Sequence, residues 1–229
     1  MLTPRLPAPR PSLGTDAYAA LKQAIRENAL PPGYQGSEQE IAGQLGMSRT
    51  PVHEALIRLQ AEGLVRVLAR RGVQVCALSP EDMAEIYEAA LVLESGAAEL
   101  LAAAPPDRRA AAAAELDALT AQMESALAAD DLVAWAHADD RFHRRLLELP
   151  GNVRLAQMFH TIMDQSHRAR MLTLRLRPRP TASAPEHAAI AAAIAAGDPA
   201  AAHAAAAAHR RTARDHLLPL LAQAGMNHL

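Results

Sequence analysis

The chain has 229 residues, of which 50% are hydrophobic but only 3% aromatic, and alanine supplies much of the apolar total. This composition favours a core of close-packed helices over a β-sandwich, which needs more β-branched and aromatic side chains. No run of about 18 strongly apolar residues occurs, so we expect no membrane association. The single cysteine, Cys76, excludes an intramolecular disulfide, and the proline-rich start lacks the apolar core of an export signal. We therefore expect a soluble cytoplasmic protein.

Charge is distributed unevenly along the chain, although the formal net charge is only −2. Residues 1–78 hold nine Lys and Arg against six Asp and Glu, whereas residues 79–229 hold fourteen against nineteen. Nine of the ten histidines lie in the second part. This asymmetry predicts two domains of different chemistry. We expect a flexible arm over residues 1–14, one domain over residues 15–78 and a second over residues 79–229.

Two short helices joined by a glycine-containing turn are predicted in the first domain. Ser37 and Glu40 have the spacing of a capping box that opens the first of them, and Gly46 ends it. Ser48 is placed to cap the second helix, which ends near Gly63. These proportions are typical of a helix-turn-helix.

A further helix precedes this pair, and two strands follow it. The helix begins near Thr15, and the strands are expected over residues 64–68 and 73–76. The hairpin tip between the strands carries two cations, Arg70 and Arg71. Three helices and a cationic β-hairpin make up a winged helix-turn-helix, so the sequence predicts double-stranded DNA as a partner.

The exposed start of the second helix of the pair is the part that such motifs place in the major groove. Arg49 is suited to pair with guanine or with phosphate, and Thr50 to bind phosphate. The expected DNA contacts are Ser48, Arg49, Thr50, His53, Arg58, Arg70, Arg71 and Gly72. The alternative is a solvated helix with ordinary surface cations.

This domain resembles the GntR family of bacterial transcription regulators over about residues 15–77. The resemblance is carried by Pro32-Gly33, the helix from Ser37 to Gly46, Ser48-Arg49-Thr50-Pro51-Val52, Glu54-Ala55-Leu56, Leu59, Glu62-Gly63-Leu64-Val65 and Arg71-Gly72-Val73. His53 departs from the family pattern, which usually has arginine there, and Gln39 stands where well-studied members often have another. Since both replacements remove a fixed charge, we expect operator contacts that differ from the usual ones.

Six helices are predicted in the second domain, and nothing in it alternates like a strand. They lie at about residues 80–103, 107–129, 131–149, 152–176, 185–196 and 199–224. Ser79 is expected to cap the first, with Pro80 at its first position, and Asn152 to cap the fourth. The predicted fold is thus mainly α, with an antiparallel bundle of about six helices after the winged domain.

Four side chains of the second domain form a candidate metal site. Asp139 and His143 are four residues apart and share one helical face, while His187 and His209 come from later helices. Three imidazoles and one carboxylate suit a divalent transition metal, with zinc preferred over nickel, manganese or cobalt. The alternative is that these histidines are surface residues or hydrogen-bonded core residues, because spacing alone does not show that they converge.

The second domain resembles the FCD domain, the effector half of the FadR-like branch of GntR regulators, over about residues 80–220. The matching residues are Asp139, Phe142-His143, Gly151-Asn152, Glu186-His187, Ile190, Ala193-Ile194, Gly197-Asp198, Ala202 and His209. The resemblance implies that Asp139, His143, His187 and His209 coordinate the ion. It also implies that an open coordination position accepts a small carboxylate or sugar acid.

One position departs from the FCD pattern in a way that concerns the effector. The family usually has an arginine four residues before Glu94, and here that residue is Ala90. Arg168, Arg170 and Arg175 on the fourth helix are candidates to replace it in holding an anionic effector, against the alternative that they are solvated.

The two resemblances imply a homodimeric regulator, expected to be a repressor, whose affinity for a palindromic operator changes when the bundle binds its effector. One alternative is a metal-dependent hydrolytic enzyme that uses Asp140 or Glu186 as a general base and its winged domain for association only. Another is a DNA-binding scaffold whose bundle only dimerises. The groove-facing pattern favours the regulator, since neither acid belongs to a recognised hydrolytic motif.

Overall fold

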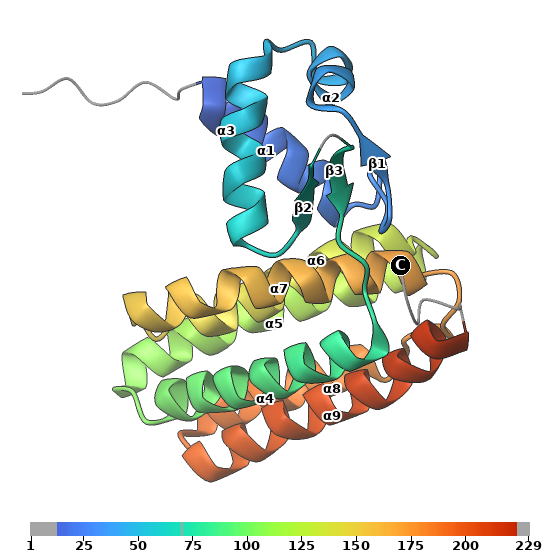
Figure 1. The fold of residues 1–229 in the computed structure, drawn as a ribbon. Coiled ribbons are helices and arrows are strands. Elements are labelled where there is room, and N and C mark those ends of the chain that lie inside the picture. Colours follow the sequence, from blue (N-terminus) through green and yellow to red (C-terminus); the bar gives the residue numbers. More distant parts are fainter. Residues whose placement is uncertain (1–12, 70, 224–229) are drawn as a thin grey trace, which may run out of the picture. The chain divides into compact units, whose positions relative to one another are not determined.

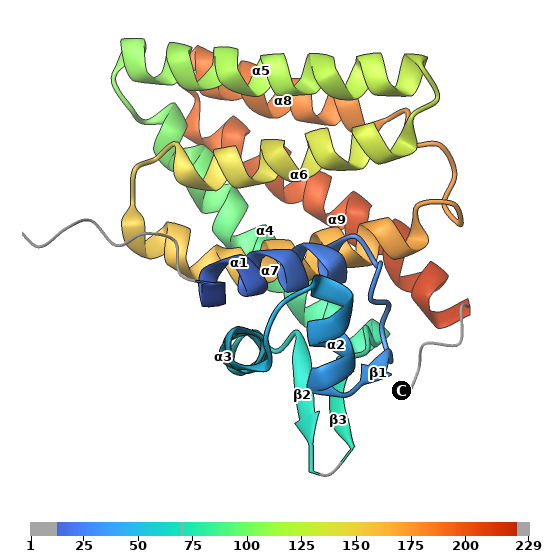
Figure 2. The same cartoon turned by 90° about the horizontal axis from the view of Figure 1, so that it is seen from above.

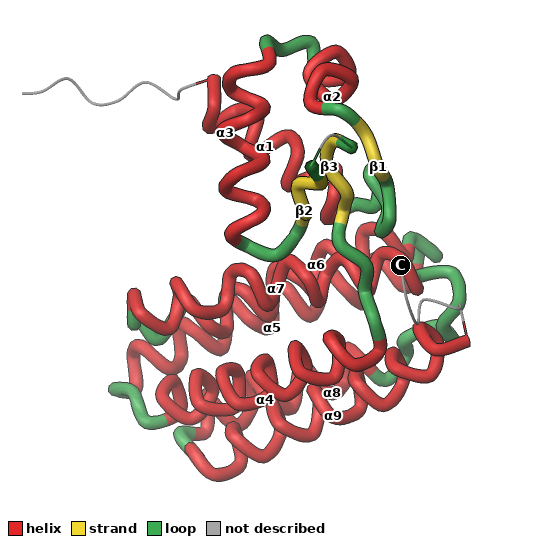
Figure 3. The backbone as a smooth tube through the Cα atoms, in the orientation of Figure 1, coloured by secondary structure: helices red, strands yellow, loops and turns green. Residues whose placement is uncertain are grey.

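A computed structural model of the chain describes residues 13–69 and 71–223 (Figure 1). The chain divides into two compact units, one ending at Ala77 and the other beginning at Leu78. Within the described residues, all strands belong to the first unit (Figure 3). Residues 1–12 of the predicted arm and Arg70 of the predicted hairpin tip lie outside the described residues. The first helix already includes Leu13 and Gly14, the last two residues of that predicted arm.

The N-terminal unit has the predicted winged helix-turn-helix fold. Its elements are α1 (Leu13–Arg26), β1 (Gln35–Gly36), α2 (Glu38–Leu45), α3 (Arg49–Ala61), β2 (Val65–Leu68) and β3 (Gly72–Val75). The strands form an antiparallel sheet in the order β1-β3-β2, in which β2 and β3 make the wing. Val52, Ala55, Leu56 and Leu59 of α3 are at most 2% exposed and belong to the core of this unit.

Of the two side-chain caps predicted for the helix pair, the one at the start of α2 forms and the one at the start of α3 does not. The Ser37 hydroxyl accepts from the amide of Glu40 at 3.2 Å, and the Glu40 carboxylate accepts from the amide of Ser37 at 2.7 Å, so the predicted capping box is present. Gly46 ends α2 in the left-handed conformation, with a φ of 63°. Ser48 occupies the cap position of α3, but its side chain makes no capping hydrogen bond.

The short strand β1 was not predicted from the sequence. It pairs with β3 through Gln35 opposite Gln74 and Gly36 opposite Val73. Gly72 has a φ of 84°, and a Cβ atom there would lie 2.3 Å from the carbonyl oxygen of Gly36. Gly72 is therefore required by the close approach of β1 and by its own backbone conformation.

The C-terminal unit is the predicted helical bundle. Its helices are α4 (Pro80–Ala102), α5 (Pro106–Ala128), α6 (Leu132–Glu148), α7 (Val153–Thr173), α8 (Ser183–Ala196) and α9 (Pro199–Gln223). α4 packs along α9, and α5 packs against both α6 and α8 (Figure 2). The caps at Ser79 and Asn152 are present, since their side chains accept from backbone amides of the first turns of α4 and α7.

Two helix boundaries in the bundle differ from the expected ones. α7 ends at Thr173, before the expected residue 176, and α8 begins at Ser183, before the expected residue 185. Arg175 and its neighbours therefore lie in the connection between these helices, not on a helix. None of the helices in the described part of the chain combines the length and apolar character that a membrane span needs.

Candidate functional site

The four predicted metal ligands come together inside the C-terminal unit. Asp139 and His143 lie one turn apart on α6, His187 lies on α8, and His209 lies on α9. All four are buried, and one ligand atom from each lies within 4.8 Å of the others. The Nε2 atom of His143 is 3.2 Å from that of His187 and 3.3 Å from that of His209. The structure thus brings together the residues that spacing alone could not show to converge.

Each of the three imidazoles is held through its other ring nitrogen. Nδ1 of His143 is 3.0 Å from the carboxylate of Glu94, and Nδ1 of His209 is 2.7 Å from that of Glu186. Nδ1 of His187 is 2.7 Å from the carbonyl oxygen of Ser183, which can only accept a hydrogen bond. These contacts place the ring proton on Nδ1 and leave Nε2 as a bare electron pair, which is the arrangement that metal-binding histidines adopt.

Burial keeps the imidazoles of His143 and His187 neutral. It lowers the pKa of His187 to about 3, with a further contribution from His209. Burial, followed by the charge of Arg210, lowers the pKa of His143 well below its ordinary value. A neutral imidazole with its proton on Nδ1 can only accept at Nε2, so three Nε2 atoms that face one another have no proton to share. A cation at their centre satisfies all three, so the donor set fits a divalent metal.

The carboxylate of the cluster is ionised. Burial alone raises the pKa of Asp139, but the charge of Arg170 outweighs this effect, so the pKa lies below its usual range. Nη2 of Arg170 is 2.6 Å from Oδ2 of Asp139, and Oδ1 is 3.7 Å from Nε2 of His187. The site therefore offers one carboxylate and three imidazole donors.

A buried ion pair that the sequence did not predict contacts the cluster through His143. Arg210 of α9 donates through two nitrogens to Glu94 of α4, and neither side chain is exposed to solvent. The same carboxylate binds His143, so Arg210, Glu94 and His143 form one chain of contacts. Ala90 is buried and carries no charge, and the guanidinium that pairs with Glu94 comes from α9. No simple spacing signal relates Glu94 to Arg210, which lies 116 residues away.

A cavity of about 300 Å³ lies beside the cluster, with Asp139 and His209 in its wall. Its other lining residues come mainly from α9 and from the connection between α7 and α8, and they include Tyr87, Trp135, Arg170, Arg177, Arg179, Ser183, Glu186 and Thr212. This volume is at the lower end of small-molecule sites. The cavity thus places two of the predicted metal ligands, Asp139 and His209, beside a set of arginines.

The three arginines expected at the effector site have different positions. Arg170 lines the cavity, whereas Arg168 is buried and Arg175 is exposed, and neither of these two lines it. Arg177 and Arg179 do line the cavity and were not predicted. They follow the end of α7, where helical spacing gives no guide to side-chain position.

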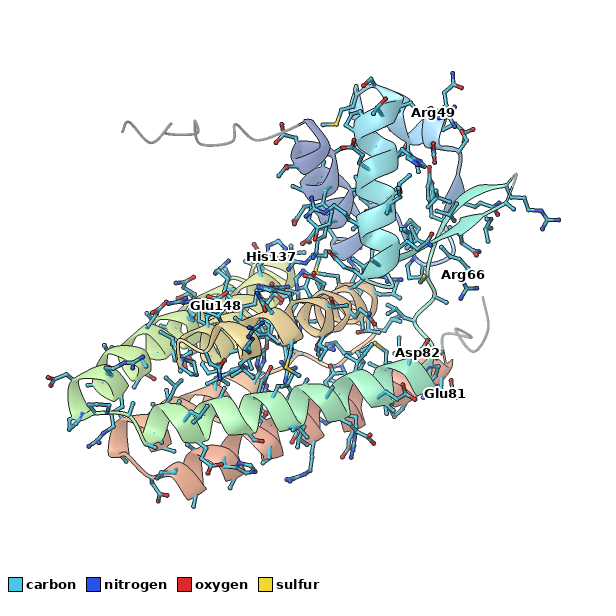
Figure 4. The ribbon with its side chains drawn as sticks, turned by 60° about the vertical axis from the view of Figure 1, so that its left-hand side comes forward. Arg49, Arg66, Glu81, Asp82, His137 and Glu148 are labelled. Atoms are coloured by element: carbon cyan, nitrogen blue, oxygen red, sulfur yellow. The ribbon has the colours of Figure 1, made fainter. Side chains whose placement is uncertain are left out.

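The expected DNA-binding residues lie mainly on the surface of the N-terminal unit. Figure 4 shows Arg49 near the start of α3 and Arg66 on the strand β2. Arg49 Nε lies 3.0 Å from Glu38, and Nδ1 of His53 lies 2.8 Å from the same carboxylate, while both side chains remain more than half exposed. Ser48 and Thr50 are also exposed.

The remaining cations of this unit have different surroundings. The guanidinium of Arg58 lies 3.7 Å from the ring centre of Tyr18, so this side chain packs against α1. Arg71 is exposed, and its carbonyl oxygen accepts from Gln35. Arg66 is exposed on β2, next to the buried Val65, and was not predicted as a contact.

The two acids considered as general bases have partners in the bundle. Asp140 pairs with Arg144 at 2.9 Å, and Glu186 holds Nδ1 of His209 at 2.7 Å. Glu186 also lines the cavity, where its contact orients a metal ligand.

Comparison with known proteins identifies both halves of the chain. Residues 13–75 match the family described as bacterial regulatory proteins, gntR family, and residues 85–212 match the FCD domain. An uncharacterized HTH-type transcriptional regulator of Agrobacterium vitis, in the TAR-I ttuE-ttuC' intergenic region, is 53% identical over 131 residues, which cover 57% of this chain and 77% of that protein. The gluconate operon transcriptional repressor of Bacillus subtilis is 25% identical over 166 residues, which cover 72% of this chain and 67% of that protein.

The fold has a close counterpart among solved structures. McbR/YncC of E. coli superposes with a TM-score of 0.78 at 22% identity, over 93% of this chain and 99% of that one. The relatives are transcriptional regulators and not enzymes, which argues against the hydrolytic alternative. The chain belongs to the GntR family of bacterial transcriptional regulators, in the FadR-like branch whose C-terminal half is an FCD domain.

Proposed function

We propose that this regulator acts as a cytoplasmic homodimer whose operator affinity is controlled by a small carboxylate bound next to a divalent metal ion. Residues 15–78 read the DNA, and residues 79–229 dimerise and bind the effector. Asp139, His143, His187 and His209 hold the ion, for which zinc is the first candidate and nickel, manganese and cobalt are alternatives. Two copies read half-sites about one helical turn apart, so the operator is a palindrome.

The observation that carries this proposal is the convergence of three unprotonated Nε2 atoms beside a cavity. Glu94 of α4 and Ser183 and Glu186 of α8 hold the opposite ring nitrogens, so the Nε2 atoms are oriented before any ion binds. Two of the four donors, Asp139 and His209, line the cavity, so an ion held by the cluster would be within reach of an oxygen ligand bound there. A carboxylate is the matching ligand, because the cavity also contains arginines.

The names of the relatives support repression of the regulated genes over activation. The Bacillus subtilis relative is named as the repressor of a gluconate operon, and gluconate is a sugar acid. We expect the effector to bind one arrangement of the dimer more tightly than the other. By linkage, operator DNA then changes the affinity for the effector by the same factor.

Metal analysis of the purified protein tests the first part of this proposal. We expect about one ion per chain in the parent protein and a large loss of metal in His143→Ala, because this imidazole is central to the cluster. His203→Ala is the matched control, since His203 is an exposed histidine on α9 that pairs with Glu99. Unchanged metal content in His143→Ala would remove His143 from the site.

DNA binding tests the second part. Operator duplexes selected from a random pool are titrated with metal-loaded protein, with and without sugar acids and other small carboxylates chosen by thermal shift. A regulator shows an operator affinity that changes with the carboxylate and loses this response in His143→Ala. An affinity that ignores both the metal and every carboxylate would instead identify a DNA-binding scaffold whose bundle only dimerises.

A further inference from the structure

One arginine of the cavity has no carboxylate partner. Arg177 lines the cavity next to Arg170 and Trp135, and among the described residues no Asp or Glu lies within ion-pair distance of it. Its Nη2 atom donates to the hydroxyl of Thr173 at 3.5 Å, and its Nε atom is buried without an acceptor among the described residues. A guanidinium in this situation has lost part of its hydration without gaining a counter-ion.

The other charged side chains of the cavity are matched. Arg170 pairs with Asp139, and Arg179 lies 3.3 Å from Asp130 and donates to a backbone carbonyl. Glu186 pairs with His209. The charge of Arg177 is therefore left for a group that enters the cavity.

A second donor in the same wall also lacks an acceptor. The indole Nε1 of Trp135 is buried and has no hydrogen-bond partner in the described part of the chain, and its side chain is only 2% exposed. The guanidinium of Arg177 lies 5.7 Å from the centre of the Trp135 ring. Because buried indole N–H groups are normally satisfied, these adjacent donors define a place for an acceptor-rich group.

We infer that Arg177 and Trp135 bind a second anionic group of the effector, and that the effector is a small diacid with one carboxylate at the metal and the other at Arg177. This inference rests on the proposed function and specifies the substrate class of the same site. A metal ion in the cluster adds positive charge to the cavity wall that Asp139 alone does not neutralise. A dianion matches both positive positions, whereas a monoacid leaves one of them unmatched.

Isothermal titration of the metal-loaded protein with matched acids tests this inference. The pairs are succinate against butyrate and glucarate against gluconate, which differ mainly in one terminal carboxylate. We expect the parent protein to bind at least one diacid about tenfold or more tightly than its monoacid, as a charge-assisted contact to a half-buried cation provides. Arg177→Gln should remove most of this preference, while Arg177→Lys should retain part of it.

Arg175→Gln is the matched control, because Arg175 lies in the same connection but is exposed and outside the cavity. Trp135→Phe should also weaken diacid binding, since it removes the N–H group and retains an aromatic ring. Equal affinities within each pair, failure of both diacids to bind, or an unchanged preference in a folded Arg177→Gln protein would each overturn the inference. Metal content is measured in the same samples, so a chain that retains its metal but ignores Arg177 disproves only the diacid, whereas a parent chain without metal disproves the proposed site.

Discussion

Glu38 contacts two of the side chains expected to reach DNA. Its carboxylate, which is only 15% exposed, lies 3.0 Å from Arg49 and 2.8 Å from His53. The hydrogen bond from His53, aided by that from Arg49 and opposed by burial, lowers the pKa of Glu38, so this group is ionised at neutral pH. Glu38 therefore orients Arg49 at the start of α3 before DNA arrives, and it competes with DNA for the same guanidinium.

Arg49→Ala separates the two roles available to this arginine. If Arg49 pairs with guanine, the substitution should weaken operator binding by about 1–3 kcal/mol and relax preference at one base pair. Fluorescence anisotropy with a panel of single-base-pair operator variants measures both effects. Arg154→Ala, which removes an exposed arginine on α7, controls for the change in net charge. A loss that is uniform across the panel would show that Arg49 binds phosphate.

The cap of α2 decides how firmly the first helix of the helix-turn-helix is held. Ser37→Ala removes the side-chain acceptor of the capping box, which is worth about 1 kcal/mol, so amide exchange in α2 should become about fivefold faster. Hydrogen–deuterium exchange of the peptide covering α2 measures this effect. Ser48→Ala is the control, because the Ser48 side chain makes no capping bond and its removal should leave exchange in α3 unchanged. Equal acceleration in both variants would contradict a specific role for the capping box.

The elements that the sequence predicts well are those with local signals. α2 is delimited by Ser37 and Gly46, and the buried stripe of α3 follows from helical spacing. β1 has no such signal, because two residues form a strand here only through pairing with β3. Its neighbour Gly72, expected as a DNA contact, has a steric reason to be glycine.

For the candidate metal site, the sequence indicated the candidate ligands but not the side chains that surround them. Asp139 and His143 are one helical turn apart, and the sequence offered His187 and His209 from later helices as further candidates. The FCD resemblance implied that all four coordinate one ion. Glu94 and Arg210 were missed as partners of this cluster, since their contact depends on how α4 packs along α9. Arg177 was missed because it follows the end of α7, where side-chain direction depends on the conformation of the connection.

The C-terminal unit buries several ion pairs inside its helical bundle. Ion pairs join Glu94 to Arg210, Asp139 to Arg170 and Asp164 to Arg144, and most of these side chains are nearly inaccessible. The two histidines with lowered pKa values, His143 and His187, are at most 1% exposed. Burial of neutral imidazoles in this core links the stability of the whole unit to pH.

The free energy of unfolding of the metal-free C-terminal unit should fall as the pH is lowered from 6.5 to about 4.5. An unfolded histidine takes up a proton near pH 6.5, whereas folded His187 does so only near pH 3, so the unfolded state binds more protons throughout this window. Each buried histidine contributes up to about 1.4 kcal/mol per pH unit, and the full stability is present above pH 6.5. Urea unfolding followed by the fluorescence of Trp135, the only tryptophan of the chain, measures this slope in the presence of a chelator.

His187→Gln should make the slope shallower, while His203→Gln, which changes an exposed histidine of α9, should leave it unaltered. A free energy of unfolding that is constant between pH 6.5 and 4.5 would show that the histidines of the cluster are already protonated in the folded protein, and such a cluster would not be prepared to bind a metal ion.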